Sequence, residues 1–147
     1  MSYTPIRAVQ HCSEHDSESG SAVAFVAYTH QGAPAPFSDS KPMVMTQHAH
    51  RHGLAFVAPV LGSGVALLGE RAQRKIVPVS PQRFARIDED EAGGTTALLM
   101  GAPAEVIEID TWVAQTGEVM RWSCTLGADG SSVRLDLLAG ECSPGHN

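Results

Sequence analysis

Three histidines, His48, His50 and His52, alternate with other residues near the middle of the chain. On a β-strand, side chains two positions apart point to the same face, so these imidazoles would project together. Imidazole nitrogens bind Zn²⁺ at about 2.0 to 2.1 Å, and three protein ligands with an open position would acidify a bound water. The spacing therefore predicts a zinc site, completed by a further histidine or an acidic residue, and with it a small metal-dependent enzyme or metal-binding β-barrel.

The same stretch supports two other interpretations. A histidine-rich tract is assigned on composition, and an exposed polar loop or edge strand without metal is its commoner outcome. Neutral histidines brought together would also repel one another once protonated near about pH 6, which describes a pH-responsive contact. We therefore expect no cofactor, with zinc as the alternative.

A group of basic residues precedes a run of acidic ones. The basic residues are Arg71, Arg74, Lys75, Arg83 and Arg86, and the acidic run is Asp88-Glu89-Asp90-Glu91. Such segregation suits phosphate or RNA binding, or a head-to-tail contact in which the basic patch of one subunit meets the acidic run of the next. Solvated strands flanking a charged loop are the commonest outcome. We assign Arg71, Arg74, Arg83 and Arg86 to a candidate protein interface.

Other motifs carry little chemistry. Gly62-Ser63-Gly64 lacks the lysine of a phosphate-binding loop, and Ser63 lacks the outer glycines of a nucleophile elbow. We interpret this segment as a turn, and the sequence offers no convergent catalytic set.

The clearest structural pattern lies in the last third of the chain. Residues 105–113, 118–126 and 131–138 alternate apolar and polar side chains and are separated by short glycine-bearing turns, which predicts a three-stranded antiparallel meander. Trp122 shares the apolar face of its strand and is expected in the core. Trp112 falls on the face of Glu108 and Asp110, so it is either an exposed contact or a ring covered by a second layer or by the N-terminal arm, and the sequence favours neither. As an exposed contact it would support a third functional hypothesis, a carbohydrate-binding sandwich.

The remaining chain reads as further short strands separated by breaks. The expected strands are 22–28, 43–46, 54–61, 65–68, 75–79, 84–87 and 95–100, with a helical turn at 71–75 and a proline-rich loop at 31–42. Without an amphipathic helix, this pattern predicts an all-β fold of about eight strands, an antiparallel β-sandwich or jelly-roll-like barrel. We expect a polar N-terminal arm at 1–21, a single β domain at 22–140 and a C-terminal tail at 141–147.

The three cysteines give no disulfide signal. Cys12, Cys124 and Cys142 are odd in number and lack a CxxC spacing, so reduced thiols are the default expectation. Cys124 lies on the apolar face of its strand, as a small buried hydrophobe would. A Cys12–Cys142 pair is the alternative that the sequence leaves open.

Composition limits the partners. The 147 residues include 16 acidic and 10 basic ones, a formal charge of −6, which disfavours a broad nucleic-acid footprint or binding to an anionic membrane. No apolar stretch is long enough to span a bilayer, and the N-terminus has no signal-peptide pattern. We expect a soluble protein made in the cytoplasm, a location that also fits a virion component.

These observations favour a non-catalytic function. The preferred hypothesis is a structural or assembly module of a larger complex, such as a virion, with protein partners and homo-oligomeric association. The zinc enzyme and the carbohydrate-binding module are the alternatives.

Overall fold

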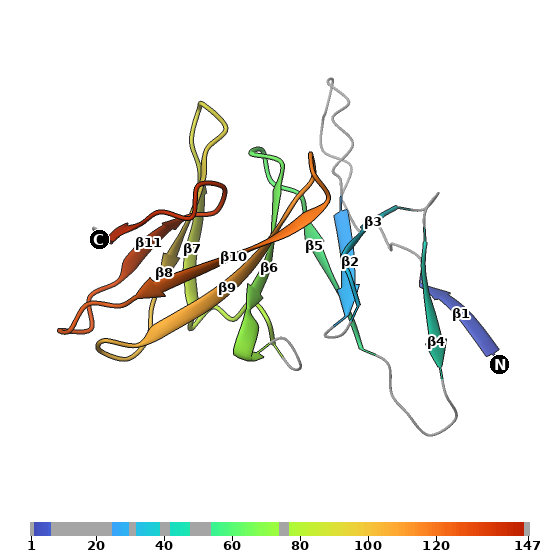
Figure 1. The fold of residues 1–147 in the computed structure, drawn as a ribbon, viewed down its shortest axis with the longest axis horizontal. Helices are drawn as coiled ribbons and strands as arrows, with labels where there is room; N and C mark the ends of the chain where they lie inside the picture. Colours follow the sequence, from blue (N-terminus) through green and yellow to red (C-terminus); the bar gives the residue numbers. More distant parts are fainter. Residues whose placement is uncertain are drawn as a thin grey trace, which may run out of the picture. The chain divides into compact units, whose positions relative to one another are not determined.

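The computed structural model describes residues 2–6, 25–29, 32–38, 42–47, 54–73 and 77–145 (Figure 1). The chain divides into two compact units, residues 1–59 and 60–147. The described residues form short antiparallel strands and one 3-10 turn, so the predicted all-β fold is confirmed. None of them lies in an apolar helix of membrane-spanning length.

The first unit contains two small sheets. Its strands are β1 (Ser2–Ile6), β2 (Phe25–Thr29), β3 (Ala35–Phe37), β4 (Met43–Gln47) and β5 (Ala55–Pro59). β1 pairs with β4, and the other sheet has the order β3-β2-β5. The predicted polar arm therefore begins with a strand, although residues 7–24 lie outside the described part.

Strand β3 corrects the predicted loop at 31–42. Pro36 stands opposite Val26 in the β2–β3 register, and β3 is the edge strand of its sheet. Proline cannot donate to a ladder, but an edge strand has one side without a partner, where the missing N–H costs nothing. Proline content alone therefore could not exclude this strand.

The second unit is a sandwich of two antiparallel sheets. Its elements are β6 (Val65–Glu70), the 3-10 turn η1 (Arg71–Gln73), β7 (Phe84–Glu89), β8 (Thr95–Leu99), β9 (Val106–Val113), β10 (Glu118–Thr125), β11 (Val133–Asp136) and β12 (Cys142–Pro144). One sheet has the order β10-β9-β6 and the other β12-β11-β8-β7.

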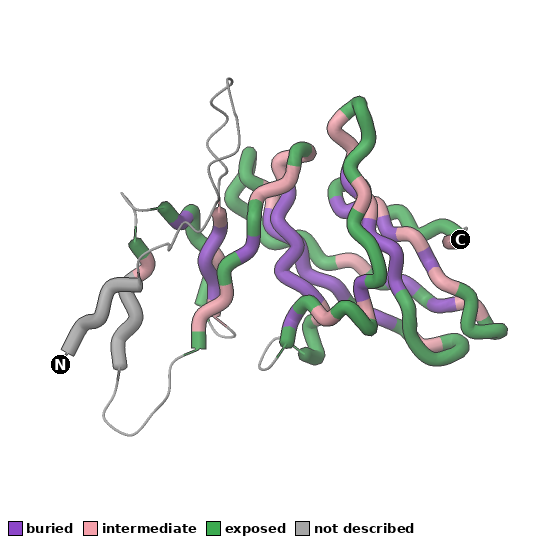
Figure 2. The backbone as a smooth tube through the Cα atoms, turned by 180° about the vertical axis from the view of Figure 1, so that it is seen from behind, coloured by how far each residue is buried: buried purple, intermediate pink, exposed green. Residues whose placement is uncertain are grey.

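The core of this unit draws apolar side chains from both sheets. The buried cluster comprises Val65, Leu67, Phe84, Ala97, Leu99, Ile107, Ile109, Cys124, Leu126, Val133, Leu135 and Leu137, with Trp122 packed against it as predicted. Figure 2 shows the buried positions gathered along the inner strands and the exposed ones in the turns. The predicted sandwich is therefore present, built from alternate inward-facing residues.

The predicted meander is only partly correct. β9 and β10 form the expected hairpin, in which Trp122 stands opposite Ile109. The third strand, β11, pairs with β8 and β12 and so belongs to the other sheet. Both sheets turn their apolar faces to one core, so alternation along β11 fits either sheet and does not reveal which one it joins.

Two further boundaries differ from expectation. Residues 77–79 are not in a strand, and the predicted tail at 141–147 contains β12. The stretch at Val77 to Val79 has another role, because the Pro78 carbonyl accepts a hydrogen bond from the Glu70 N–H at 2.8 Å. The prediction of one β domain over 22–140 stays a prediction.

Candidate functional site

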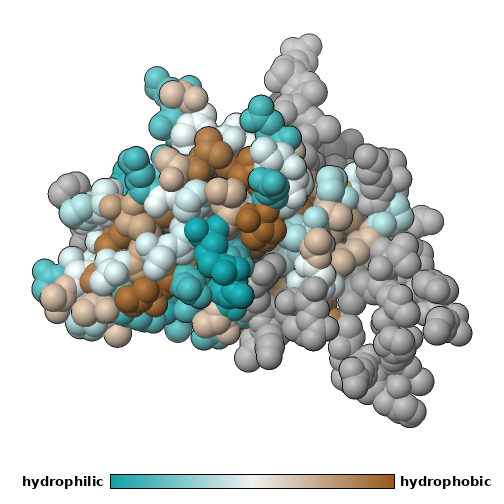
Figure 3. Space-filling model, viewed as in Figure 1, coloured by the Kyte–Doolittle hydropathy of each residue, from teal (hydrophilic) through white to brown (hydrophobic). Residues whose placement is uncertain are grey.

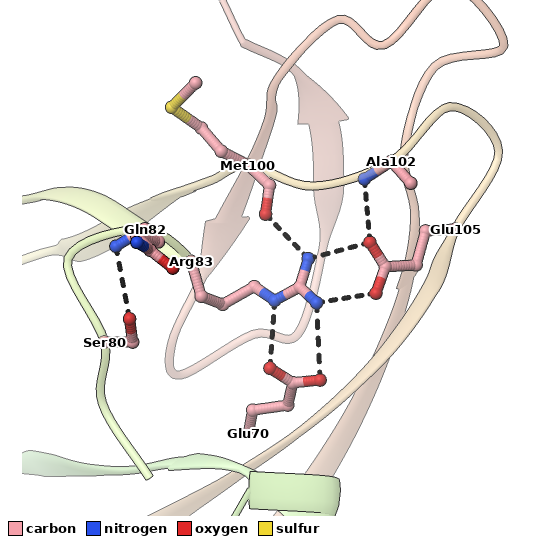
Figure 4. A network of polar contacts seen from close by, with 7 residues as sticks. All are labelled: Glu70, Ser80, Gln82, Arg83, Met100, Ala102 and Glu105. Atoms are coloured by element: carbon pink, nitrogen blue, oxygen red, sulfur yellow. Dashed lines mark hydrogen bonds and ion pairs between the residues drawn. The ribbon is translucent and has the colours of Figure 1, made fainter. Parts of the chain in front are cut away.

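A network of polar contacts among the described residues of the second unit is centred on Arg83, just before β7 (Figure 4). Its Nε donates to Glu70 Oε2 at 2.9 Å, and its Nη2 donates to Glu105 Oε1 at 2.6 Å. Its Nη1 donates to Glu105 Oε2 at 3.0 Å and to the Met100 carbonyl at 2.7 Å. Arg83 therefore ties together the end of β6, the end of β8 and the start of β9.

The cluster uses the full hydrogen-bonding capacity of the guanidinium. A guanidinium has five N–H donors, and with the longer Nη2 to Glu70 Oε1 bond at 3.4 Å all five have partners. The hydrogen bond to Glu105 raises the pKa of Arg83 further above its usual range. The bond from Arg83, followed by that from the Ala102 N–H, lowers the pKa of Glu105. The cation stays charged and leaves no donor for a ligand.

A hollow of about 410 Å³ opens beside this cluster. It is lined by Glu70, Gln73, Val77, Ser80, Gln82, Arg83, Met100 and Gly101. Val77 is 49% exposed and Met100 is 47% exposed, so the apolar part of the wall faces solvent. The volume is within the range of small ligand sites, about 300 to 1,000 Å³.

Two of the polar residues that line the hollow, Ser80 and Arg83, have hydrogen-bond partners within the chain. Ser80 Oγ accepts a hydrogen bond from the Gln82 N–H at 3.3 Å, so the hydroxyl is engaged with the backbone. Arg83 pairs with both carboxylates, so the three side chains together carry a formal charge of −1. The hollow therefore offers apolar contact from Val77 and Met100, with amide side chains from Gln73 and Gln82 for hydrogen bonding.

The predicted basic interface is dispersed among separate ion pairs. Arg71 Nε lies 3.9 Å from Glu108 Oε2, and Arg86 Nε lies 2.8 Å from Asp88 Oδ2. Arg83 belongs to the cluster above, and Arg74 lies outside the described residues. The structure thus gives Arg71, Arg83 and Arg86 acidic partners within this chain, and their role in an interface stays a prediction.

Of the two interpretations of Trp112, the exposed contact is wrong and the covered ring is confirmed. Its side chain is 4% exposed, and the indole Nε1 is buried without a hydrogen-bond partner. The period places Trp112 on the face of Asp110 as expected, but that face is buried here, and Asp110 is 0% exposed. Arg121 Nε lies 3.3 Å from Asp110 Oδ1, which compensates a buried charge that the sequence suggests should be solvated. Without exposure, Trp112 does not support the carbohydrate-binding hypothesis.

The expectation of reduced thiols is also wrong. Cys124 in β10 and Cys142 in β12 form a disulfide with a Cα–Cα distance of 5.8 Å. Cys124 is buried in the core, as predicted, but Cys142 bonds to it and not to Cys12. The two cysteines are 18 residues apart and become neighbours only because β10 and β12 lie on the same side of the sandwich, information that cysteine spacing does not hold.

The histidine hypothesis concerns residues outside the described part of the chain. His48, His50 and His52 all lie there, so the zinc site stays a prediction. Within the described ranges, no group of three or more histidine, cysteine or acidic side chains is arranged to hold a metal ion.

Glu70 and Glu105 are the site residues that the sequence does not indicate. They stand 13 and 22 positions from Arg83 in sequence, and only the packing of the two sheets brings them together. No protein-family model matches the chain, and comparisons with curated proteins and with solved structures give no match.

Proposed function

We propose that the chain is a non-catalytic structural module that associates with protein chains, copies of itself first, through the hollow beside Arg83. The observation that supports this proposal is that the lining of the hollow combines a fully hydrogen-bonded guanidinium with exposed apolar side chains. All five donors of Arg83 are satisfied internally, whereas Val77 and Met100, which also line the hollow, are about half exposed. Such a surface accepts an apolar side chain from a partner and fixes its position.

The same chain also supplies apolar side chains that protrude. Val106 is 61% exposed and Leu138 is 49% exposed, and neither lines the hollow. A hollow and a complementary protrusion at different places on one chain make a head-to-tail contact, which closes into rings or continues as filaments. Figure 3 shows apolar residues interspersed with hydrophilic ones on the described part of the face in view, as expected where binding uses localised contacts.

Native mass spectrometry of untagged protein over a concentration series tests this proposal. We expect oligomers that grow with concentration and that Met100→Ser shifts toward monomer. Met120→Ser is the matched control, because Met120 is 36% exposed on β10 and does not line the hollow. A protein that stays monomeric throughout, or equal effects of the two substitutions, would contradict the proposal.

A further inference from the structure

The disulfide joins the two sheets at one side of the sandwich. Cys124 lies in β10, the edge strand of the sheet β10-β9-β6, and Cys142 lies in β12, the edge strand of the other sheet. Arg83 makes the corresponding connection by ion pairs at the β6 and β7 edges. The two sheets are therefore joined by a disulfide at the β10 and β12 edges and by ion pairs at the β6 and β7 edges.

The two sulfurs lie in different environments. Cys124 is 1% exposed and belongs to the core cluster, whereas Cys142 belongs to a three-residue strand that is exposed throughout. A thiolate attacks a disulfide in line with the S–S bond, from the side opposite the leaving sulfur, and access decides which sulfur is attacked. A thiolate in solution can reach Cys142 on its exposed strand. To attack Cys124, the thiolate would have to pass through the core.

The contacts of the turn before β12 do not depend on the disulfide. Trp122 Nε1 donates to the Leu137 carbonyl at 3.2 Å, and Asp136 Oδ1 accepts from the Leu138 and Ala139 N–H groups at 2.8 Å each. By contrast, among the described strands β12 pairs with β11 alone, over three residues, with one further bond from the Gly145 N–H to the Ser132 carbonyl at 2.9 Å, and Pro144 has no N–H to donate. The strand is thus the weakly held part of the segment and the turn is its anchor.

We propose that the Cys124–Cys142 bond is a redox-controlled latch that a thiol opens through Cys142, releasing β12 while the sandwich stays folded. A small dithiol supplies the electrons. Its thiolate bonds to Cys142 Sγ, the S–S bond breaks, and Cys124 Sγ leaves with the electron pair and takes a proton. The second thiol of the reagent then displaces Cys142 as a free thiol and closes a cyclic disulfide, so the protein gains the two electrons that the dithiol loses.

Alkylation in dithiothreitol without denaturant tests the latch, in a Cys12→Ser background that removes the third thiol. We expect Cys142 to react with iodoacetamide at least ten times faster than Cys124, which stays buried. Hydrogen exchange should increase at residues 142–145 and in the β11 amides that face them, with β9 and β10 unchanged. Equal alkylation rates, or loss of protection throughout β9 and β10, would overturn the proposal, because either result means that reduction unfolds the sandwich.

The Cys142→Ser variant provides a second measurement that does not depend on the reductant. It should reproduce the exchange pattern of the reduced parent, since it lacks the bond but keeps Cys124 as a buried thiol. Cys124→Ser serves for comparison, because it places a hydroxyl in the apolar core and should raise exchange in β9 and β10 as well. If Cys142→Ser shows that wider pattern, the local latch is refuted.

Discussion

Residue partnerships give the second unit its specific connections. Arg83 is a clear case, because its guanidinium and the Glu70 carboxylate are largely shielded and hydrogen-bonded to each other, whereas the Glu105 side chain is 32% exposed. The side chain of Arg83 is 15% exposed and that of Glu70 is 13% exposed. Removing Arg83 would leave the shielded Glu70 carboxylate without the donors that the guanidinium supplies, which costs more than the loss of an exposed pair.

Replacing Arg83 with methionine should therefore lower the free energy of unfolding by about 2 to 3 kcal/mol, because the Glu70 carboxylate and the Met100 carbonyl lose their donors. Arg86→Met is the matched control. Arg86 pairs with Asp88, but its side chain is 54% exposed, so we expect a loss of about 0 to 1 kcal/mol. Urea unfolding of both variants measures the difference, and equal losses would show that the cluster is no more than a surface ion pair.

The cluster also predicts a pH dependence. The pKa of Glu105 is lower in the folded chain than its ordinary value of 4.5, so its contribution to stability is present above that value. The contribution is lost as the pH falls through the lowered, folded-state pKa. Glu105→Gln should therefore flatten the acid limb of the stability curve measured by urea unfolding. In an Arg83→Met background the same substitution should change the slope less, and an equal change in both backgrounds would rule out Arg83 as the main cause.

At the scale of elements, turns and edges decide which strands meet. The hairpin that leads into β12 is closed by Gly140, whose φ is +74°, and a Cβ at this position would fall on ring carbons of Trp122. Gly117, in the turn between β9 and β10, has a similar φ of +72°, but a Cβ there would meet nothing within 4 Å. Substitutions at the two glycines therefore allow two costs to be told apart. Both positions would have the cost of the left-handed backbone, but only Gly140 would add a clash with Trp122.

Gly117→Ala should cost only the left-handed backbone strain, about 1 to 2 kcal/mol. Gly140→Ala should cost that amount and a further 1 to 3 kcal/mol or so for overpacking against Trp122. Urea unfolding of the two variants measures the contrast. If both lose the same stability, the approach of Trp122 to this turn is not a constraint on the fold.

Alternation and turn residues make several elements of the sandwich predictable from sequence. β8, β9 and β10 lie close to their expected positions, because period-two patterning is a local property of each strand. The sheet to which β11 belongs is not local information, since its apolar face fits the core from either side. The same limit explains Trp112 and the Cys124–Cys142 pair. Trp112 is buried because both faces of β9 are covered around it. The two cysteines meet because the edge strands β10 and β12 come together, and both outcomes arise only when the strands pack.

At the scale of the whole chain, three sets of stabilising interactions lie within residues 60–147. The apolar cluster, the Arg83 ion pairs and the disulfide are internal to that unit. We therefore expect a fragment of residues 60–147 to fold alone, with a cooperative urea transition and near-ultraviolet circular dichroism like that of the full chain. A fragment without a cooperative transition would show that residues 1–59 are required for the sandwich to form.

The disulfide should add to the stability of the second unit without being required for its fold. A cross-link stabilises mainly by restricting the unfolded chain, and a separation of 18 residues corresponds to about 3 kcal/mol. In a Cys12→Ser background, Cys142→Ser should lower the free energy of unfolding by that amount, and reductant should lower that of the parent similarly. Reductant should not affect Cys142→Ser, which has no bond to break. In the Cys12→Ser background, protein treated with iodoacetamide without reductant should stay unmodified and should weigh two hydrogen atoms less than the reduced, unalkylated form. An unchanged urea midpoint on adding reductant to the parent would contradict this prediction, because the sheets would then be held by packing and the Arg83 ion pairs without covalent help.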